Sequence, residues 1–207
     1  IKIINDLRET PNETLASVVA NARIDGELLA DRDVFGYFNI IATAGHDTTS
    51  YSLTGGMLAF LQNPDQLAKL RADPALMPLA VEEVLRWTAP VKHFCRTAVR
   101  DCTVAGKQIK AGDYLLLSFP SGSFDEKVYE DPFTFRIDRK PNRHLAFGTG
   151  PHVCLGQYLA RFELQSFFRE LLDRVEHIEL AGEPRFVEGS FVGGVKYLPV
   201  RYTMKQQ

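Results

Sequence analysis

The sequence has little cysteine, little net charge and no long hydrophobic run. Its three cysteines, Cys95, Cys102 and Cys154, are an odd number and include no CxxC pair. This argues against a disulfide framework and a zinc site, and it favours a reducing compartment. A net charge of -2 makes a nucleic-acid partner unexpected. Without an apolar run of about 18 residues or a signal peptide, we expect a cytoplasmic protein with no membrane partner.

Apolar periodicity predicts that the first half of the chain is helical. A pattern that begins at Asp31, the expected capping residue, continues for about 30 residues across a polar centre and predicts one long, centrally distorted helix. Asn63 and Pro64 mark the cap and the first position of a second helix. The segment PLAVEEVLRW predicts a third helix, which Pro90 ends.

The second half of the chain changes its pattern several times. Residues from Phe94 to Leu117 form short β-like runs, and TVAGKQI around Gly106 predicts a hairpin. Residues 120–151 are rich in Pro, Asp, Asn and Gly, which predicts a long and therefore functional loop. A helical pattern follows from Leu155 to about Arg174. The tail, VKYLPVRYTM, alternates as a strand does.

Residues 144–161, HLAFGTGPHVCLGQYLAR, place one cysteine in a glycine-rich loop before a helix. In a purely structural interpretation the glycines build turns and Cys154 is a small buried apolar residue. Nucleotide-binding motifs do not fit this loop, because Val153 stands where a dinucleotide fingerprint needs a glycine and no GK[ST] follows for a P-loop. His152, two residues from Cys154 on a tight loop, is also an awkward base for a nucleophilic thiol.

A thiolate metal ligand is the interpretation that remains. Cys154 lies just before a helix N-terminus, where the dipole and the unpaired N–H groups favour a negative sulfur. The loop glycines lack side chains, so a flat macrocycle can approach the backbone. Arg96, His144 and His152 are cationic or donor groups that can meet carboxylates at the edge of a macrocycle. We therefore expect a haem.

The centre of the long helix, AGHDTTS at residues 44–50, is a poor helix interior. Asp, Thr and Ser compete for backbone hydrogen bonds, and Gly adds flexibility. In the structural interpretation the segment is a kink where neighbouring helices pack closely. In the functional one, Thr48 bonds toward the carbonyl of Ala44, or opens a gap there, and makes a polar notch beside an apolar cavity. Asp47 then relays protons.

Glu83 and Arg86, in the segment EEVLR, are spaced i,i+3 and share one helix face. Most such pairs are solvated salt bridges that contribute little to stability. Their apolar neighbours Val84, Leu85 and Trp87 favour a covered helix instead. A covered ion pair needs further partners.

Together these three segments resemble the cytochrome P450 haem-thiolate monooxygenases. FGTGPHVCLG is similar to the family's F-G-x-G-x-[HR]-x-C-x-G haem loop, AGHDTTS to its oxygen-activating [AG]-G-x-[DE]-T-[TS] segment, and EEVLR to its buried E-x-x-R. The resemblance runs from near Asp31 to the C-terminus. RWTAPVKHFCRTAVRD and SFVGGVKYLPVRY are most similar to soluble bacterial members that hydroxylate terpenoid or similar apolar molecules.

The resemblance implies a mainly α fold with small β-sheets, the cytochrome P450 fold. Residues 1–207 would be a single partial domain, the C-terminal half of a catalytic domain, with the long central helix and the haem loop. Heme b would be the cofactor, with Cys154 as the proximal iron ligand and with Arg96 and His152 at the haem propionates. The residues expected to bind the cofactor are Arg96, His144, Phe147, Gly148, His152, Cys154 and Gly156.

The resemblance also implies roles for residues outside the loop. Asp47 and Thr48 would be catalytic and deliver protons to bound oxygen, whereas Glu83 and Arg86 would be structural. The residues expected to face the substrate, by family position alone, are Ala44, Gly45, Val91, Lys92, Phe191 and Val192.

The chain departs from the family's pattern in two respects. Family members are usually about twice as long. In addition, Phe124 stands where related sequences often have Arg in an Asn-Arg-Asp run, and Thr134 where Pro-x-Arg-Phe is common. These differences leave the third partner of Glu83 and Arg86 open, and we expect it to be His144.

The expected reaction is insertion of one oxygen atom from O2 into a small apolar substrate, terpenoid-like or aromatic. No flavin or iron–sulfur motif is present, so the resemblance implies a separate donor, a ferredoxin with its NAD(P)H-dependent reductase. Two alternatives stay open. A haem-binding sensor or carrier would need no acid–alcohol pair, and a peroxide-driven enzyme would need no redox partner.

Overall fold

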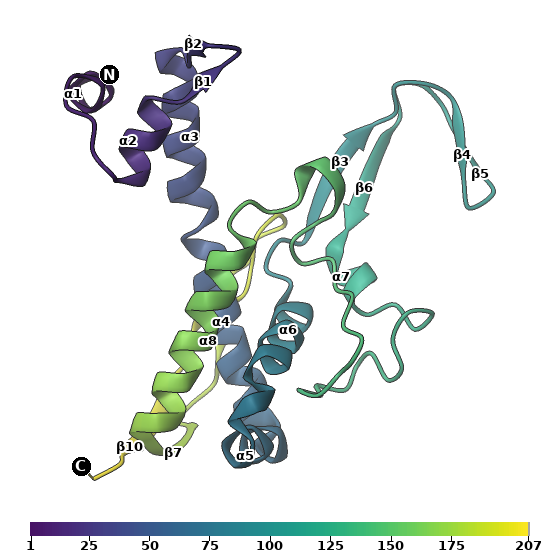
Figure 1. The fold of residues 1–207 in the computed structure, drawn as a ribbon. Helices are drawn as coiled ribbons and strands as arrows, with labels where there is room; N and C mark the ends of the chain where they lie inside the picture. Colours follow the sequence, from purple (N-terminus) through teal and green to yellow (C-terminus); the bar gives the residue numbers. More distant parts are fainter. Residues whose placement is uncertain (207) are drawn as a thin grey trace. The chain divides into compact units, whose positions relative to one another are not determined.

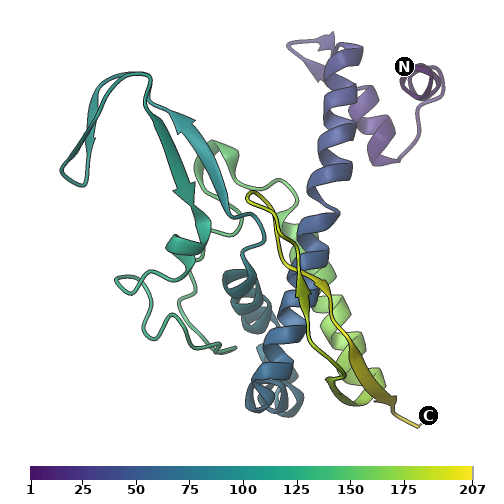
Figure 2. The same ribbon diagram turned by 180° about the vertical axis from the view of Figure 1, so that it is seen from behind.

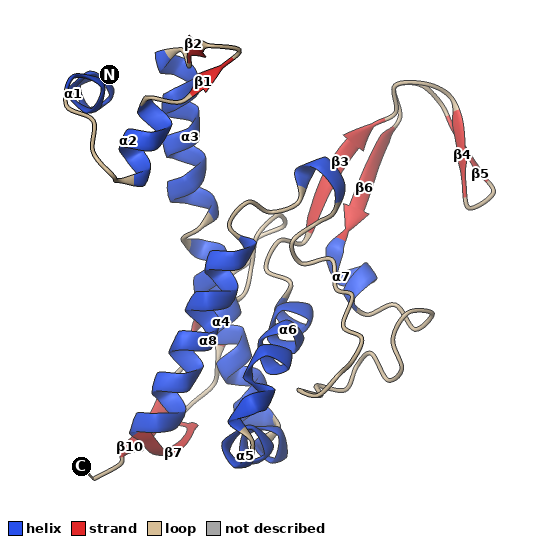
Figure 3. Cartoon of the chain, viewed as in Figure 1, coloured by secondary structure: helices blue, strands red, loops and turns tan. Residues whose placement is uncertain are grey.

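The computed structural model describes residues 1–206, which are mainly helical with small two-stranded sheets, as the sequence predicted (Figures 1 and 3). The helices are α1 (Lys2–Glu9), α2 (Leu15–Ala20), α3 (Asp31–Ala44), α4 (Asp47–Gln62), α5 (Pro64–Ala72), α6 (Met77–Thr88), α7 (Phe119–Ser123) and α8 (Gln157–Arg174), with 3-10 turns η1 (Pro74–Leu76) and η2 (Gly150–His152). The strands are β1 (Arg23–Ile24), β2 (Glu27–Leu28), β3 (His93–Thr97), β4 (Cys102–Val104), β5 (Lys107–Ile109), β6 (Tyr114–Ser118), β7 (Val175–Leu180), β8 (Arg185–Phe186), β9 (Val195–Tyr197) and β10 (Val200–Met204).

The chain divides into two compact units, Ile1–Asp47 and Thr48–Gln207. The first unit has its own small core, in which Ile4 of α1, Ala20 of α2 and Val34 of α3 are buried together. Arg8 connects these elements by donating to the carbonyls of Ala20 and Leu29 and to the carboxylate of Asp31, over distances of 2.6 to 2.9 Å.

The prediction that Asp31 caps the long helix was wrong. Ala30 is the capping residue, and Asp31 lies in the first turn of α3 with its carboxylate bound to Arg8. Sequence reasoning also missed the β1–β2 hairpin. Its turn, Asp25–Gly26, has positive φ at both positions, and Asp-Gly is a hairpin signal that was present in the sequence.

The predicted long helix is interrupted within AGHDTTS, at the place where distortion was expected. α3 ends at Ala44, Gly45 donates its N–H to the carbonyl of Ile41 at 3.3 Å, and α4 begins at Asp47. In α4 the hydroxyls of Ser52 and Thr54 each donate to the carbonyl four residues earlier, at 2.9 Å. Such bonds compete with the helical ladder, so both glycine and hydroxyl residues weaken the helix here.

The core of the second unit lies between α4, α6 and α8, and α4 runs beside α8 in both views (Figures 1 and 2). Phe60 of α4 meets the rings of Phe135 and Phe168 edge to face, with centroids 5.3 Å apart in each pair. Gly55 and Gly56 lie where α4 approaches α6 closely. Small residues are therefore required on this face of α4.

Gly56→Ala should destabilise the protein because the core has no room for a methyl group. A Cβ at this position would lie 2.6 Å from Val84 Cγ1 and 3.1 Å from Phe168 Cζ. Overpacking of this kind costs about 1 to 3 kcal/mol in the free energy of unfolding, measured by denaturant titration. Gly36→Ala in α3 is the matched control, because its Cβ would meet nothing within 4 Å. An equal effect of both substitutions would contradict the close packing of α4 against α6.

The predicted hairpin around Gly106 is confirmed. β4 and β5 pair antiparallel, with positive φ at Ala105 and Gly106. β3 and β6 pair antiparallel from His93 opposite Ser118 to Thr97 opposite Tyr114. Residues 120–151 are mostly without regular structure, as expected.

The tail was predicted as one strand, and this was wrong. β9 pairs with β8, whereas β10 pairs with β7, and Leu198 and Pro199 separate the two strands. Proline interrupts a β-ladder because it has no N–H to donate. The alternating pattern continues across this interruption and therefore did not reveal the change of partner.

Candidate functional site

Glu83 lies at the centre of a buried ion cluster. Its carboxylate accepts two hydrogen bonds of 2.8 Å from Arg86 and further bonds from Arg139 at 3.2 and 3.3 Å. The side chain of Asn142 and the backbone N–H of Arg136 also donate to it, at 3.0 and 2.9 Å. The side chains of Glu83 and Arg86 are 0% exposed, so the pair is covered, as its apolar neighbours predicted.

The two arginines of this cluster hold the loop that precedes the cysteine segment. Arg86 donates to the carbonyls of Ser123 and Pro132 at 2.9 and 2.8 Å. Arg139 donates to the carbonyls of Glu130, Asp131 and Thr134 at 2.6 to 3.0 Å. Glu83 supplies one negative charge for two arginines, so backbone carbonyl dipoles rather than a second carboxylate compensate the other positive charge. A loop with little regular structure gains fixed partners in this way.

The prediction that His144 is the third partner of Glu83 and Arg86 was wrong, because Arg139 has that place. Arg139 is the last residue of the segment FRIDR. It lies five residues after Thr134, the position at which the family's Pro-x-Arg-Phe pattern has its arginine. Phe124, the other departure from the family's pattern, packs its ring 5.0 Å from the Arg86 guanidinium. It therefore contributes a cation–π contact to the same cluster.

A second ion cluster contains Glu82, His144 and Arg161, and we call it the Glu82 cluster. Arg161 donates to both carboxylate oxygens of Glu82, at 2.6 and 3.0 Å. His144 Nε2 lies 3.0 Å from Glu82 Oε2, and His144 Nδ1 accepts the N–H of Ala146. Both ring nitrogens of His144 are therefore engaged within the protein. Contact of His144 with a carboxylate of the cofactor stays a prediction.

Burial alone would raise the pKa of Glu82, but hydrogen bonds from His144 and Arg161, together with the positive charge of Arg161, lower this pKa from 4.5 to about 2. The ionised carboxylate therefore stabilises the folded state above pH 4.5, and this contribution is lost as the pH falls from 4.5 towards 2.

Glu82→Gln should consequently lower the free energy of unfolding at pH 7 and have little effect near pH 2. Urea titrations at pH 7, 4 and 2.5 would measure the difference between the two proteins. Glu163→Gln on α8, an exposed position, is the control. A destabilisation by Glu82→Gln that does not shrink in acid would show that the charge of Glu82 is not what stabilises the fold.

The cysteine loop has a fixed backbone and an exposed thiol. Cys154 donates its N–H to the carbonyl of Phe147 at 2.9 Å, and Val153 donates to Gly150 at 3.0 Å. Gly148 and Gly150 have φ of 68° and 70°, where residues with a side chain are strained. Cys154 is a free, exposed cysteine, which overturns the structural interpretation of a small buried apolar residue.

The surroundings of Cys154 fit a haem. A Cβ at Gly156 would lie 4.0 Å from the Cys154 sulfur, so the absence of a side chain there keeps the sulfur accessible. Large apolar side chains are exposed beside the thiol and along the first turns of α8: Val153, Leu155, Tyr158, Leu159 and Phe162. An exposed apolar surface next to a soft sulfur ligand is suited to a flat apolar macrocycle that carries iron.

Arg96 and His152 are both exposed, on β3 and η2. Arg96 donates from Nη1 to the carbonyl of Cys95. The Phe147 ring packs against the Arg161 guanidinium, 4.6 Å from Cζ to the ring centroid. Contact of these residues with a cofactor stays a prediction.

The predicted catalytic residues are consecutive at the start of α4, where Asp47 is exposed and Thr48 is half-buried.

Four of the residues predicted to face substrate lie together. Val91 and Val192 form an antiparallel β-bridge, and Lys92 donates its N–H to the carbonyl of Phe191 at 2.8 Å. The other two, Ala44 and Gly45, are exposed at the C-terminal end of α3. That these residues contact substrate stays a prediction.

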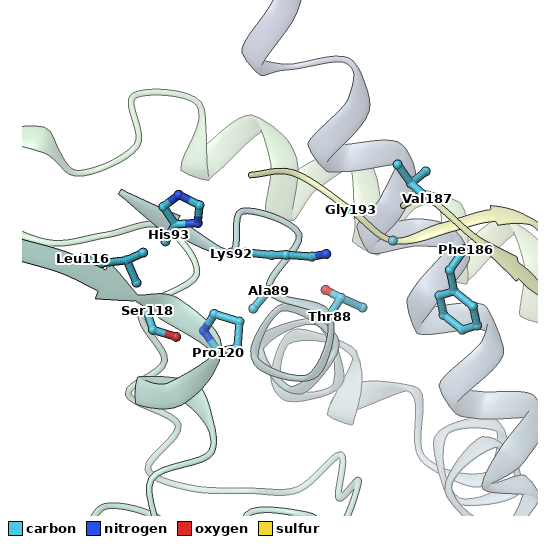
Figure 4. Close-up of a pocket in the computed structure, with 11 residues that line it drawn as sticks. Thr88, Ala89, Lys92, His93, Leu116, Ser118, Pro120, Phe186, Val187 and Gly193 are labelled. Atoms are coloured by element: carbon cyan, nitrogen blue, oxygen red, sulfur yellow. The ribbon is translucent and has the colours of Figure 1, made fainter. Parts of the chain in front are cut away.

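A pocket of about 500 Å³ lies beside the bridged segments (Figure 4). The ammonium group of Lys92 reaches across it and donates to the carbonyl of Gly189 at 2.5 Å. Leu116, Pro120 and Phe186 give the pocket an apolar part, and Thr88 and Ser118 contribute hydroxyl groups. Of the residues that line this pocket, only Lys92 was named from the sequence. The other residues come from separate elements that meet only in the folded chain.

Within residues 1–206, which the structure describes, no helix is both long enough and apolar enough to cross a membrane.

Comparisons with known proteins agree with this fold. The family model described as Cytochrome P450 matches residues 5–202. Cytochrome P450-terp of a Pseudomonas species is 50% identical over 198 residues, covering 96% of this chain and 46% of that protein. A steroid C26-monooxygenase of Mycolicibacterium smegmatis is 40% identical over 203 residues, covering 97% and 51%.

Solved structures give the same result. The crystal structure of CYP108D1 from Novosphingobium aromaticivorans aligns with a TM-score of 0.92 and 48% identity, covering 98% of this chain and 49% of that one. The chain thus spans about half the length of the curated relatives it matches. With the family model, the sequence identities and the fold in agreement, the chain belongs to the cytochrome P450 family.

Proposed function

We propose that this chain carries the thiolate-ligand half of a haem monooxygenase that inserts one oxygen atom from O2 into a small apolar substrate. The observation that carries the proposal is the Cys154 loop: an exposed thiol on a backbone fixed by its bond to Phe147, beside exposed apolar side chains. Heme b is the proposed cofactor, and when bound it supplies oxygen activation and electron transfer.

The chain's own residues have separate tasks in this proposal. Cys154 supplies the thiolate, and the glycines around it leave room for the macrocycle. Arg96 and His152 donate hydrogen bonds to carboxylates at the cofactor's edge. The Thr48 hydroxyl holds a proton on the side of the cofactor where O2 binds. The Asp47 carboxyl group resupplies this proton after it has been transferred. His144 supports the loop through its bond to Glu82, and its contact with the cofactor stays a prediction.

An apolar substrate is supported by the relatives and by the chain. The named steroid C26-monooxygenases act on a steroid, which is a bulky apolar molecule. Val91, Phe191 and Val192, which the bridge brings together, are apolar side chains suited to a terpenoid-like or aromatic substrate. The proposed electron donor is a ferredoxin with its NAD(P)H-dependent reductase, as the family resemblance implies.

Thr48→Ala tests the proposed reaction. Without the hydroxyl, protons reach oxygen without control, so O2, two electrons and two protons leave as hydrogen peroxide. The rate of product formation should decrease by a factor of about 10² to 10⁴, the contribution that general acid–base groups make. Haem content and the rate of reduction should stay near those of the parent. Asp47→Asn should slow oxygen consumption itself, because the proton supply is cut.

The measurement is product and hydrogen peroxide formed per reductant consumed, with Thr49→Ala as the control for an adjacent hydroxyl. Unchanged coupling in Thr48→Ala would remove Thr48 from the mechanism. A parent that binds haem but forms no product from apolar candidates with a ferredoxin would favour a sensor or carrier. Turnover with hydrogen peroxide alone, at the same rate, would favour a peroxide-driven enzyme.

A further inference from the structure

The Glu82 cluster connects three parts of the second unit through one carboxylate. Glu82 lies on α6, Arg161 on the second turn of α8, and His144 at the start of the segment that contains Cys154. The His144 side chain is 3% exposed, and those of Glu82 and Arg161 are 24% and 26% exposed. Charge-assisted bonds in such a partly covered place are stronger than those of a solvated pair.

The two partners of Glu82 lie on either side of Cys154 in the sequence. His144 precedes Cys154 by ten residues, and Arg161 follows it by seven. Because both bind the same carboxylate, the two flanks of the cysteine loop are held to one point on α6. Closing a loop at both ends reduces the conformations that its interior can adopt.

A chain of contacts also runs from Glu82 into the loop. The Arg161 guanidinium, oriented by the carboxylate, lies over the Phe147 ring at 4.6 Å. The Phe147 carbonyl accepts the N–H of Cys154 at 2.9 Å. The His144 ring lies 5.9 Å from the Phe147 ring on the same segment. Loss of the carboxylate would therefore free the residue whose carbonyl fixes the cysteine backbone.

We propose that Glu82 is a positioning residue which, through His144 and Arg161, holds the Cys154 loop in its ligand-binding conformation before any cofactor binds. The inference rests on the proposed function only in taking Cys154 as the ligand. The loop needs such support because its thiol and its apolar neighbours are exposed and two of its residues have positive φ. Regions of this kind open easily unless they are held from outside. The low pKa of Glu82 agrees with a carboxylate that stays ionised between its two hydrogen-bond donors.

Amide hydrogen exchange of the protein without cofactor tests this inference directly. The Cys154 N–H is the reporter, and the amides of Leu164 and Phe168, in the core of α8, report global opening. In Glu82→Gln the Cys154 amide should be accelerated about 10- to 100-fold more than the α8 reporters, as expected for the loss of charged hydrogen bonds, because the α8 reporters respond only to the loss of global stability. Glu163→Gln, at an exposed position on the same helix, should leave both unchanged.

Arg161→Lys separates positioning from simple charge. Lysine keeps the positive charge but not the planar fork that binds both carboxylate oxygens and stacks on Phe147. It should therefore give an intermediate acceleration at Cys154. Equal acceleration of Cys154 and of the α8 reporters in Glu82→Gln would overturn the proposal, because Glu82 would then only stabilise the whole fold. No acceleration at Cys154 would overturn it too.

The carbonyl complex of the reduced, haem-loaded protein gives a spectroscopic readout that loss of stability alone would not move. Glu82→Gln should convert part of the thiolate-type Soret band into the band of a complex without thiolate, at unchanged haem content. If Cys154→Ala retains the thiolate-type band, the proposed function fails. If Cys154→Ala loses the band while Glu82→Gln changes neither the band nor the exchange of the Cys154 amide, only the role of Glu82 fails.

Discussion

Cys154→Ala is expected to abolish the strongly red-shifted Soret band that a thiolate ligand gives to the reduced carbonyl complex. The reason is structural as well as chemical. Among the described residues, Cys154 is the cysteine whose loop combines positive-φ glycines, a backbone bond to Phe147 and exposed apolar neighbours. Alanine preserves this backbone and removes only the sulfur. Absorption spectra with carbon monoxide after reduction measure the result.

Cys95→Ala and Cys102→Ala are matched controls, because both cysteines are also free and exposed. They lie on β3 and β4, away from any glycine-rich loop, and both variants should retain the band. A red-shifted band that persists in Cys154→Ala, or that disappears in either control, would show that Cys154 is not the ligand.

Arg86→Ala is expected to lower the free energy of unfolding by about 3 to 5 kcal/mol, the cost of removing one partner from a buried ion pair. Glu83 would keep Arg139 and Asn142, but the carbonyls of Ser123 and Pro132 would lose their donor. The contacts of the guanidinium with three aromatic rings would also be lost. The loop before the cysteine segment should then open, and little haem-loaded protein should form.

Arg174→Ala is the appropriate comparison, because Arg174 forms an exposed i,i+4 pair with Glu170. An exposed pair of this kind contributes about 0.3 to 0.5 kcal/mol. Denaturant titration and haem content per protein would be measured for both variants. If Arg86→Ala folds with parental stability, holds haem and fails only in turnover, the structural role of the Glu83 cluster is wrong.

Local signals in the sequence predicted much of this architecture. Pro64 begins α5, the helix over EEVLR ends before Pro90, and Ala105–Gly106 turns a hairpin, because each of these features depends on the backbone preferences of adjacent residues. The interruption near Gly45 was also visible, since glycine and hydroxyl residues weaken a helix wherever they occur. The cysteine loop was recognised because its residues are contiguous.

The partners of the buried charges were less accessible to sequence reasoning. Arg139 and Glu83 are 56 residues apart, and no local pattern distinguishes Arg139 from Arg136 or Arg143. The choice between His144 and Arg139 depends on which side chain the folded loop turns towards Glu83 and which towards Glu82, one residue away. Likewise, the two strands of the tail share one alternating pattern but pair with different partners. Tertiary packing decides these questions.

During synthesis on the ribosome, the bridge between Val91 and Val192 can form only after Val192 has been added to the chain. The two residues are 101 positions apart, and on either side of them Lys92 pairs with Phe191 and Pro90 with Gly193. At about 5 to 20 residues per second, the second segment is made about 5 to 20 s after the first. Until then, the N–H of Lys92 and the carbonyl of Pro90 have only water as a substitute for these partners. A stretch in the middle of the chain is thus among the last to acquire its final backbone pairing.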